Sequence, residues 1–394
     1  MKKYLIVGNG VAGTTAAENI RKEDREGSIT MVTDEDLPFY YRLRLSEYIS
    51  GDLTEPELIV KKDAWYRDQD IDLRLSTRVK GSEPKGKTVI LENDERLPYD
   101  FLLIATGSHS FIPPIKGADK NGVFALRSIR DGRDILAYGK EAEEVVLIGG
   151  GLLGLEAGHA LLKTGKRVAV VEFFPRLLPR QLDVEGAEIL QGIMEEMGFS
   201  FKLGAKTEEI TGDNRVDGVL LEGGERLSAK MVIISAGVRP NMELADPLEL
   251  DREKGIRVNE RLQTSRPDIY AAGDVAEFKG IPYGIWPAAA EQGKIAGINM
   301  AGGDMVYQGT TMANTLKVAG VDLASAGNID AENELESRVA TDKGVYKKIV
   351  LDKGRIVGCI MLGNTTGFTK ITRAITEKQD ISQIKDQGLF EGFH

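Results

Sequence analysis

The sequence predicts an α/β protein in which two similar domains of parallel strands and covering helices precede a small α+β domain. Three observations lead to this prediction. A strand, a glycine-rich turn, a helix and a second strand follow one another near the N-terminus. The same order recurs from Val145. The character of the sequence then changes after residue 305, where a β-hairpin at 345–363 and a helix from Phe368 to Glu377 are predicted without a glycine-rich turn of this kind.

The first copy begins with the apolar run Tyr4–Val7, which is typical of a parallel strand buried on both faces. The turn GNGVAG follows at residues 8–13, and a helix is predicted from Val11 to about Glu23. A second β-rich run, Ser28–Thr33, ends at Asp34. This order predicts a βαβ unit.

The second copy begins with the apolar run Val145–Ile148 and the turn GGGLLG at residues 149–154. A helix is predicted from Leu152 to Thr164, because Gly165 is a typical C-terminal stop. The strand Arg167–Val171 then ends on Glu172. Two further apolar strands, within residues 99–107 and 231–237, also end at a glycine.

Composition excludes several classes of protein. The chain has 394 residues with 51 Lys+Arg and 61 Asp+Glu, and this net charge of −10 argues against nucleic acid as a partner. Cys359 is the single cysteine, which excludes an intrachain disulfide and fits a reducing cytoplasm. The three histidines are too scattered for a metal cluster, and we expect no metal. The apolar stretch Val145–Leu162 contains Glu156 and several glycines, so we expect a buried strand and helix and no membrane span.

The two glycine turns predict two dinucleotide sites. In such a turn the first glycine allows the bend, the second allows a diphosphate to approach the backbone, and the third allows close packing of helix and strand. The diphosphate lies at the helix N-terminus, and a carboxylate at the end of the next strand binds ribose hydroxyls. The alternative is a glycine turn without a ligand, which the complete context in both copies disfavours. The predicted residues of the two sites are Gly8, Gly10, Val11, Ala12 and Gly13 with Asp34 or Glu35, and Gly149, Gly151, Leu152, Leu153 and Gly154 with Glu172.

Two sites in one chain favour a bound flavin and a diffusing nicotinamide. Glu172 predicts a preference for NADH, since its carboxylate would repel the 2′-phosphate of NADPH. Phe173 and Phe174, which follow it, offer no arginine for that phosphate. A third signal is the strand end Gly273–Asp274, where the carboxylate either caps the following segment or accepts a hydrogen bond from a flavin ribitol hydroxyl.

The ordered motifs GNGVAG, YDFLLIATGS, GGGLLGLE, ISAGVRPN, IYAAGDV and WPAAAEQG resemble the FAD-dependent pyridine nucleotide–disulfide oxidoreductase superfamily over residues 1 to about 305. The segments 37–46 and 314–320 resemble NADH:rubredoxin reductases and the flavin half of nitrite reductase large subunits. The resemblance implies two Rossmann-like, glutathione-reductase-type domains. It implies FAD-binding parts at 1–110 and 241–305, an NAD-binding domain at 111–240, and a C-terminal α+β domain at 306–394.

The resemblance also implies roles for single residues. Glu156 matches a glutamate near the nicotinamide ring, and its alternative is an acid on an exposed helix face. The segment from Trp286 matches a helix whose N-terminus points at the flavin. The residues that the resemblance adds to the cofactor sites are Arg42, Ala105, Thr106, Gly107, Gly237, Gly273, Asp274, Trp286 and Ala289.

Two departures from the family pattern matter. Disulfide reductases and their peroxidase relatives carry cysteine early in the first domain, where this chain has Arg42–Ser46. The second departure is Glu47, where ferredoxin-reductase relatives often have a lysine that pairs with a glutamate. Without a thiol relay, the expected acceptor of the electrons is external.

We therefore expect electrons to pass from NADH through FAD to a rubredoxin-like iron–sulfur protein. Arg42 and Arg44, or an edge at Lys347–Lys348, could form the basic patch that such an acidic partner needs. The alternatives are an H2O2-forming NADH oxidase, a flavin subunit of a nitrite reductase system, and a non-catalytic flavin-binding subunit or redox sensor. We expect a monomer or homodimer.

Overall fold

The computed structural model describes residues 1–380, with only the backbone described at 314–316. It divides the chain into two compact units. The first unit comprises Met1–Tyr41, Thr54–His109 and Val238–Thr310, and the second comprises Arg42–Leu53, Ser110–Gly237 and the chain from Thr311 onwards. The four-part domain division expected from the sequence stays a proposal.

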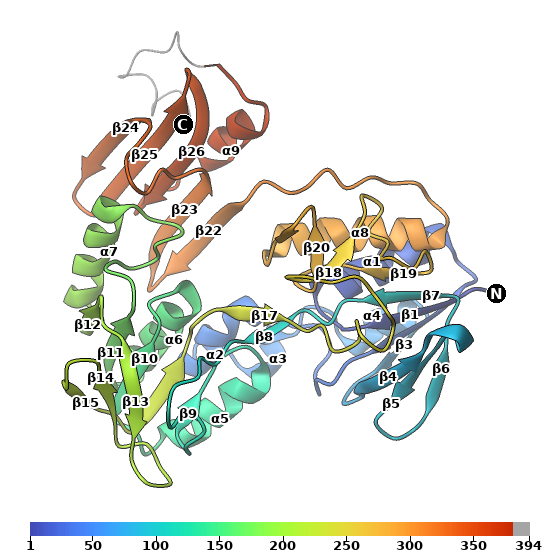
Figure 1. The fold of residues 1–394 in the computed structure, drawn as a ribbon, viewed down its shortest axis with the longest axis horizontal. Coiled ribbons are helices and arrows are strands. Elements are labelled where there is room, and N and C mark those ends of the chain that lie inside the picture. The colour runs from blue at the N-terminus through green and yellow to red at the C-terminus, as the bar shows by residue number, and fades with distance from the viewer. Residues whose placement is uncertain (381–394) are drawn as a thin grey trace. The chain divides into compact units, whose positions relative to one another are not determined.

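The first unit is built on a five-stranded parallel sheet of order β19-β7-β1-β2-β3 (Figure 1). The strands are β1 (Lys3–Val7), β2 (Ser28–Val32), β3 (Ile71–Arg74), β7 (Phe101–Ile104) and β19 (Ile269–Ala271). Two three-stranded sheets accompany it: β4 (Val79–Glu83), β5 (Thr88–Leu91) and β6 (Arg96–Pro98), and β18 (Ile256–Val258), β20 (Ala276–Phe278) and β21 (Ile281–Pro282). Its helices are α1 (Val11–Glu23), α3 (Glu55–Leu58), α4 (Asp63–Asp68), η2 (Pro84–Gly86) and α8 (Trp286–Ala301).

Both faces of this sheet are covered, which explains the continuous apolar run in β1. Tyr4 and Ile6 pack into the core on the side of α1 and α8. Leu5 and Val7 pack into a second core with residues of β5 and β7. Alternate residues of a strand face opposite sides, so a strand buried on both sides needs apolar residues at every position.

The second unit repeats the arrangement with a parallel sheet of order β12-β11-β10-β16-β9. The strands are β9 (Val123–Phe124), β10 (Glu144–Ile148), β11 (Arg167–Glu172), β12 (Phe199–Leu203) and β16 (Met231–Ile234). A three-stranded sheet of β13 (Thr207–Thr211), β14 (Gly218–Leu221) and β15 (Arg226–Ser228) lies beside it. The helices are η1 (Arg42–Arg44), α2 (Leu45–Ser50), α5 (Ile129–Gly139), α6 (Leu152–Lys163) and α7 (Val184–Glu196). Two short strands, β8 (Ser108–Ser110) and β17 (Val238–Pro240), pair at the points where the chain passes between units.

The C-terminal part of the second unit is an antiparallel sheet of order β22-β23-β26-β25-β24 with one helix, and it contacts α7 (Figure 1). Its elements are β22 (Ala313–Val318), β23 (Val321–Gly327), β24 (Glu336–Asp342), β25 (Val345–Asp352), β26 (Arg355–Leu362) and α9 (Phe368–Thr376). The predicted hairpin at 345–363 and the predicted helix after Phe368 are confirmed. Among residues 1–380 no helix is both long and apolar enough to cross a bilayer.

Candidate functional site: two dinucleotide cradles

The carboxyl ends of three neighbouring strands meet at one edge of the first sheet. Ile104 of β7 pairs in register with Val7 of β1 on one side and with Ala271 of β19 on the other. The three following loops therefore start side by side: the glycine turn 8–13, the segment 105–107 and the segment 272–274. Ligands of open parallel sheets bind at this edge.

The geometry of the first turn gives each glycine a separate role. Gly8 has a φ of +115°, and a Cβ there would lie 2.1 Å from the carbonyl oxygen of Ala105. A Cβ on Gly13 would lie 2.1 Å from the carbonyl oxygen of Gly8. A Cβ on Gly10, by contrast, would meet no atom of the described residues within 4 Å. The fold itself needs the first and third glycines, whereas Gly10 keeps open the space in front of the α1 N-terminus, as a diphosphate requires.

Asn9, in the middle of this turn, anchors an aromatic cluster that sequence reasoning missed. Its Oδ1 accepts a hydrogen bond from the Tyr66 hydroxyl (2.9 Å), which in turn accepts one from the backbone N–H of Phe39 (3.1 Å). The Phe39 ring lies 5.8 Å from that of Trp286. The Asn9 Nδ2 is buried and has no hydrogen-bond partner within residues 1–380. This buried donor, beside the open space at Gly10, fits a ligand with acceptor oxygens.

The segments after β7 and β19 are fixed by side chains from elsewhere in the unit. Thr106 exchanges two 2.8 Å hydrogen bonds with Asn241: its Oγ1 donates to the Asn241 carbonyl and its own carbonyl accepts from Nδ2. The Ser108 hydroxyl donates to Asp274 Oδ2 (2.7 Å). The backbone N–H of Gly273 donates to the buried Oε1 of Gln292 (2.8 Å). Ser108 and Gln292 were not singled out in the sequence, because only tertiary packing brings Ser108 to Asp274 and Gln292, on α8, to Gly273.

Helix α8 is held close to α1 by small residues. A Cβ on Gly293 or Gly297 would lie 2.3 or 2.5 Å from the carbonyl oxygens of Ala12 and Ala16. The N-terminus of α8, at Trp286, has no acidic residue in its first turn. Trp286 stacks on Tyr41 with ring centroids 5.3 Å apart. A helix N-terminus of this kind favours a negative charge in front of it.

Asp34 and Glu35, the two candidate ribose ligands, differ in exposure. Asp34 is exposed just past β2, and Glu35 is half-buried with its backbone N–H donating to Thr33 Oγ1 (3.3 Å). Both carboxylates follow the end of β2, where the sequence predicts the ribose ligand.

The second turn has the same glycine geometry. Gly149 has a φ of +111°, and a Cβ there would lie 2.3 Å from the carbonyl oxygen of Ser235. A Cβ on Gly154 would lie 2.7 Å from the carbonyl oxygen of Gly149. For Gly151 the nearest atom, among the residues described, is 3.9 Å away. Leu152 and Leu153 open α6 behind this turn, and Gly237 follows the neighbouring strand with a φ of +96°.

Glu172, unlike the acids after β2, is buried against its own glycine turn. Its Oε2 accepts a hydrogen bond from the backbone N–H of Gly150 (2.5 Å), and its Oε1 accepts one from that of Phe174 (2.8 Å). Each carboxylate oxygen has a further acceptor site, so the group can also receive ribose hydroxyls. The same contacts hold the turn and the loop after β11 in place.

Glu156 lies two residues past Gly154 on α6 and contacts α2. The Ser46 hydroxyl donates to its Oε2 (3.1 Å), and its Oε1 is buried without a hydrogen-bond partner in the described part of the chain. Burial raises the pKa of the Glu156 carboxyl, while the Ser46 hydroxyl and the backbone of Ala319 act in the opposite direction. Glu47 instead forms an ion pair with Arg44 (2.6 Å). Ser46 is thus the partner that sequence reasoning did not find for Glu156.

The prediction that Lys347 and Lys348 form an exposed basic patch is wrong. Lys347 and Lys348 are 7% and 0% exposed, and the Lys348 ammonium pairs with Asp183 (3.0 Å). A buried lysine with an acidic partner cannot attract an external protein. Arg42 lies in η1, where its Nη1 donates to the carbonyl of Arg127 (3.5 Å).

Cys359 is fully buried in β26. Burial raises the pKa of its thiol to about 12, so thiolate is scarce at neutral pH. This cysteine cannot serve as a redox relay.

Each unit thus collects its own set of predicted site residues. The first unit holds Gly8, Gly10, Val11, Ala12, Gly13, Asp34, Glu35, Ala105, Thr106, Gly107, Gly273, Asp274, Trp286 and Ala289. The second unit holds Arg42, Gly149, Gly151, Leu152, Leu153, Gly154, Glu156, Glu172 and Gly237. Arg42 belongs to the second unit, although its neighbour Tyr41 belongs to the first. We call the turn 8–13 with the other site residues of the first unit the first cradle, and the turn 149–154 with Glu156 and Glu172 the second cradle.

Comparison with known families decides what kind of protein carries these two cradles. The family described as pyridine nucleotide-disulphide oxidoreductase matches residues 2–293, and the rubredoxin NAD+ reductase C-terminal domain matches residues 313–379. The chain belongs to the pyridine nucleotide-disulphide oxidoreductase family. The predicted family and α/β fold class are confirmed, and the chain is an oxidoreductase of this FAD- and pyridine nucleotide-dependent kind.

Three similar proteins show the range of the family. A nitrite reductase [NAD(P)H] of Bacillus subtilis is 39% identical over 97% of this chain, and the chain spans only about half of it (48%). An NADH oxidase of Methanocaldococcus jannaschii is 33% identical over 92% of this chain and 87% of its own length. The crystal structure of NADH:rubredoxin oxidoreductase from Clostridium acetobutylicum matches with a TM-score of 0.85 and 30% identity, covering 99% of both chains.

Proposed function

We propose that this oxidoreductase takes electrons from NADH through bound FAD and delivers them to an external one-electron carrier such as rubredoxin. FAD, when bound, accepts a hydride and can release its electrons singly. The observation that supports the proposal most is the pair of cradles, each with a middle glycine that faces open space, combined with the burial of the only cysteine. A thiol or disulfide step inside the chain has no residue to carry it.

The first cradle has the residues to hold FAD. The turn 8–13 and the α1 N-terminus bind a diphosphate, and Asp274, oriented by Ser108, accepts from a ribitol hydroxyl. The N-terminus of α8 at Trp286 stabilises negative charge on the flavin ring without a group that titrates.

The second cradle has the residues to hold NADH. The turn 149–154 binds the diphosphate, and the buried Glu172 accepts from the adenine-side ribose hydroxyls. Glu156, held by Ser46, is a carboxyl whose raised pKa suits it to keeping a proton at the nicotinamide end of the site. We propose a cytoplasmic location and a monomeric or dimeric state for the same chain.

The acceptor can be tested directly. Anaerobic enzyme reduced with NADH is mixed in a stopped-flow instrument with rubredoxin, ferredoxin, a disulfide or O2, and flavin reoxidation is followed by absorbance. We expect rubredoxin to reoxidise the flavin fastest. Equal rates with rubredoxin and an unrelated acceptor would refute that choice.

A second candidate is H2O2 formation from O2, which the similarity to an NADH oxidase favours. A flavin-bearing role in nitrite reduction is the third, favoured by the relative of which this chain spans half. Fast reoxidation by O2 with stoichiometric H2O2 would establish the second candidate in place of the first.

A further inference from the structure

The loop after β11, residues Phe173–Asp183, joins the second cradle to α7. It begins directly after Glu172 and contacts the glycine turn at Gly150. Leu177 is fully buried, and its Cδ2 would be 2.9 Å from a Cβ on Gly150. The backbone N–H of Leu178 donates to the carbonyl of Gly150 (3.4 Å). The conformation of this loop and that of the turn are therefore coupled by direct contact.

The far end of the loop is fixed by the C-terminal sheet. Asp183 caps α7, since its Oδ1 accepts from the backbone N–H of Gly186 (3.1 Å). Its Oδ2 accepts from the Tyr346 hydroxyl (2.7 Å) and from the Lys348 ammonium (3.0 Å). Asp183 and Lys348 are 2% and 0% exposed, so the ion pair is shielded from water and salt.

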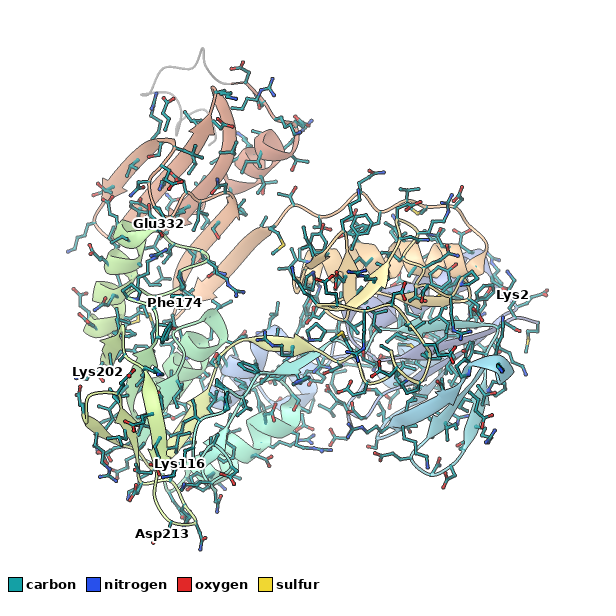
Figure 2. The ribbon with its side chains drawn as sticks, viewed as in Figure 1. Lys2, Lys116, Phe174, Lys202, Asp213 and Glu332 are labelled. Atoms are coloured by element: carbon teal, nitrogen blue, oxygen red, sulfur yellow. The ribbon has the colours of Figure 1, made fainter. Side chains whose placement is uncertain are left out.

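A second loop of the C-terminal part completes this arrangement. The Lys348 ammonium also donates to the carbonyl of Asp330 (2.9 Å) and to Asn333 Oδ1 (2.7 Å), so each of its three protons has an acceptor. Glu332, from the same loop, lies 3.5 Å from the Arg176 guanidinium in the loop after β11. Figure 2 labels Glu332 and Phe174, the residue whose backbone N–H donates to Glu172.

We propose that the C-terminal part of the chain braces the loop Phe173–Asp183 through Lys348, Tyr346 and Glu332, and that this brace sets the affinity of the second cradle for NADH. The inference rests on the proposed function of that cradle. Lys348 and Tyr346 are positioning residues, because they contact Asp183 and act on the nucleotide only through the loop. If the loop leaves its arrangement, Glu172 and Gly150 lose the contacts that orient them, and apparent affinity falls with the fraction of competent protein.

The test is the dissociation constant for NADH, measured well below the melting temperature by anaerobic calorimetry on FAD-loaded enzyme whose flavin has been reduced beforehand, so that NADH binds without transferring a hydride. Lys348→Met is expected to raise this constant about tenfold, and Tyr346→Phe, which leaves the ion pair, about threefold. FAD content and the rate at saturating NADH should not change, because the substitutions alter only the fraction of protein in which the loop holds its binding-competent arrangement. Hydrogen exchange of the Gly150 and Phe174 amides, the two donors to Glu172, should accelerate in both variants.

Arg373→Met is the matched control, because it removes a cation and an ion pair from the same part of the chain without touching the loop. It should bind NADH like the wild type. Folded Lys348→Met or Tyr346→Phe protein with wild-type NADH affinity and amide exchange would overturn the brace. If Lys348→Met does not fold, Tyr346→Phe and Glu332→Gln decide the question.

A wild type that fails to bind NADH, or a Glu172→Ala variant that binds it normally, would instead refute the proposed function of the cradle. The two failures are therefore distinguishable.

Discussion

The two glycine turns have the same backbone conformation but are stabilised in different ways. In both, a Cβ on the first glycine would collide with the backbone of a neighbouring strand loop, and the middle glycine faces open space. The first turn is held by Asn9, a side chain within the turn that reaches Tyr66. The second has Gly150 at that position and is held from outside by Glu172. The contrast fits a ligand that stays bound at the first turn and a ligand that binds and leaves at the second. At the second turn Glu172 both fixes the turn and is available to bind the ligand.

The largest effect is expected from substitutions that the backbone conformation common to both turns cannot accept. Gly8→Ala forces a side chain to φ +115° and 2.1 Å from a carbonyl oxygen, and should destabilise the protein by about 3 kcal/mol or more with loss of FAD. Gly149→Ala should cost a similar amount but retain FAD, because its collision lies in the other unit. Denaturant unfolding and the flavin spectrum of the purified variants measure both effects.

The middle glycines are the matched controls. Gly10→Ala and Gly151→Ala place a Cβ where the described residues leave room, so the folded proteins should survive while affinity for FAD or NADH falls selectively. Gly10→Ala protein as unstable as Gly8→Ala protein would contradict the separation of roles.

The next largest effect concerns the acids after the second strand of each copy. Glu172→Ala leaves two backbone N–H groups without their acceptor, which costs about 1–3 kcal/mol. NADH affinity should fall about tenfold or more, and discrimination against NADPH should shrink. Asp34→Ala should affect FAD retention much less, since Asp34 is exposed. Titration with both nucleotides measures the first effect and flavin release during dialysis measures the second. If Asp34→Ala weakened FAD binding as much as Glu172→Ala weakens NADH binding, the proposed difference between the two acids would be refuted.

A smaller effect is expected from making the first turn resemble the second. Asn9→Gly leaves the buried Tyr66 hydroxyl without its acceptor and should lower stability by about 1–3 kcal/mol. In the Tyr66→Phe background the same substitution should cost less, because the hydroxyl is already gone. Additive losses in this double-mutant cycle would show that the bond contributes nothing.

The sequence predicted those parts of the fold that depend on residues close together in the chain. Apolar runs, glycine turns and terminal acids predicted both βαβ units, because a parallel strand buried on both faces and a turn facing a diphosphate each restrict residue types locally. Ser46 beside Glu156 and Ser108 beside Asp274 could not be predicted, since each pair is formed by tertiary packing across 110 or 166 positions. Lys347–Lys348 was misjudged for the same reason. Lysine in a strand indicates an exposed edge unless a distant acid pairs with it, and Asp183, which pairs with Lys348, is 165 positions away.

The smallest expected effect tests a feature of the second copy, a half-buried acid two residues past the third glycine, where the first copy has Thr15. Burial raises the pKa of Glu156, so ionising its carboxyl disfavours the folded state. Stability from a group with a raised pKa is present at low pH and is lost as the pH rises through the folded pKa. Glu156→Gln should therefore melt near the wild-type temperature at pH 4 and about 1 to 3 °C above it at pH 8.

The control for this prediction is Ser46→Ala, which removes the hydroxyl that donates to Oε2 of the carboxylate. Because that bond favours the charged form, its loss should raise the pKa of Glu156 further and widen the gap to Glu156→Gln at high pH. Calorimetric melting curves of the three proteins between pH 4 and 8 supply the comparison. A Glu156→Gln variant that is less stable than wild type at pH 8 would show that the carboxylate is held charged by the surrounding residues. The second copy would then carry a fixed anion beside its dinucleotide in place of a group able to hold a proton.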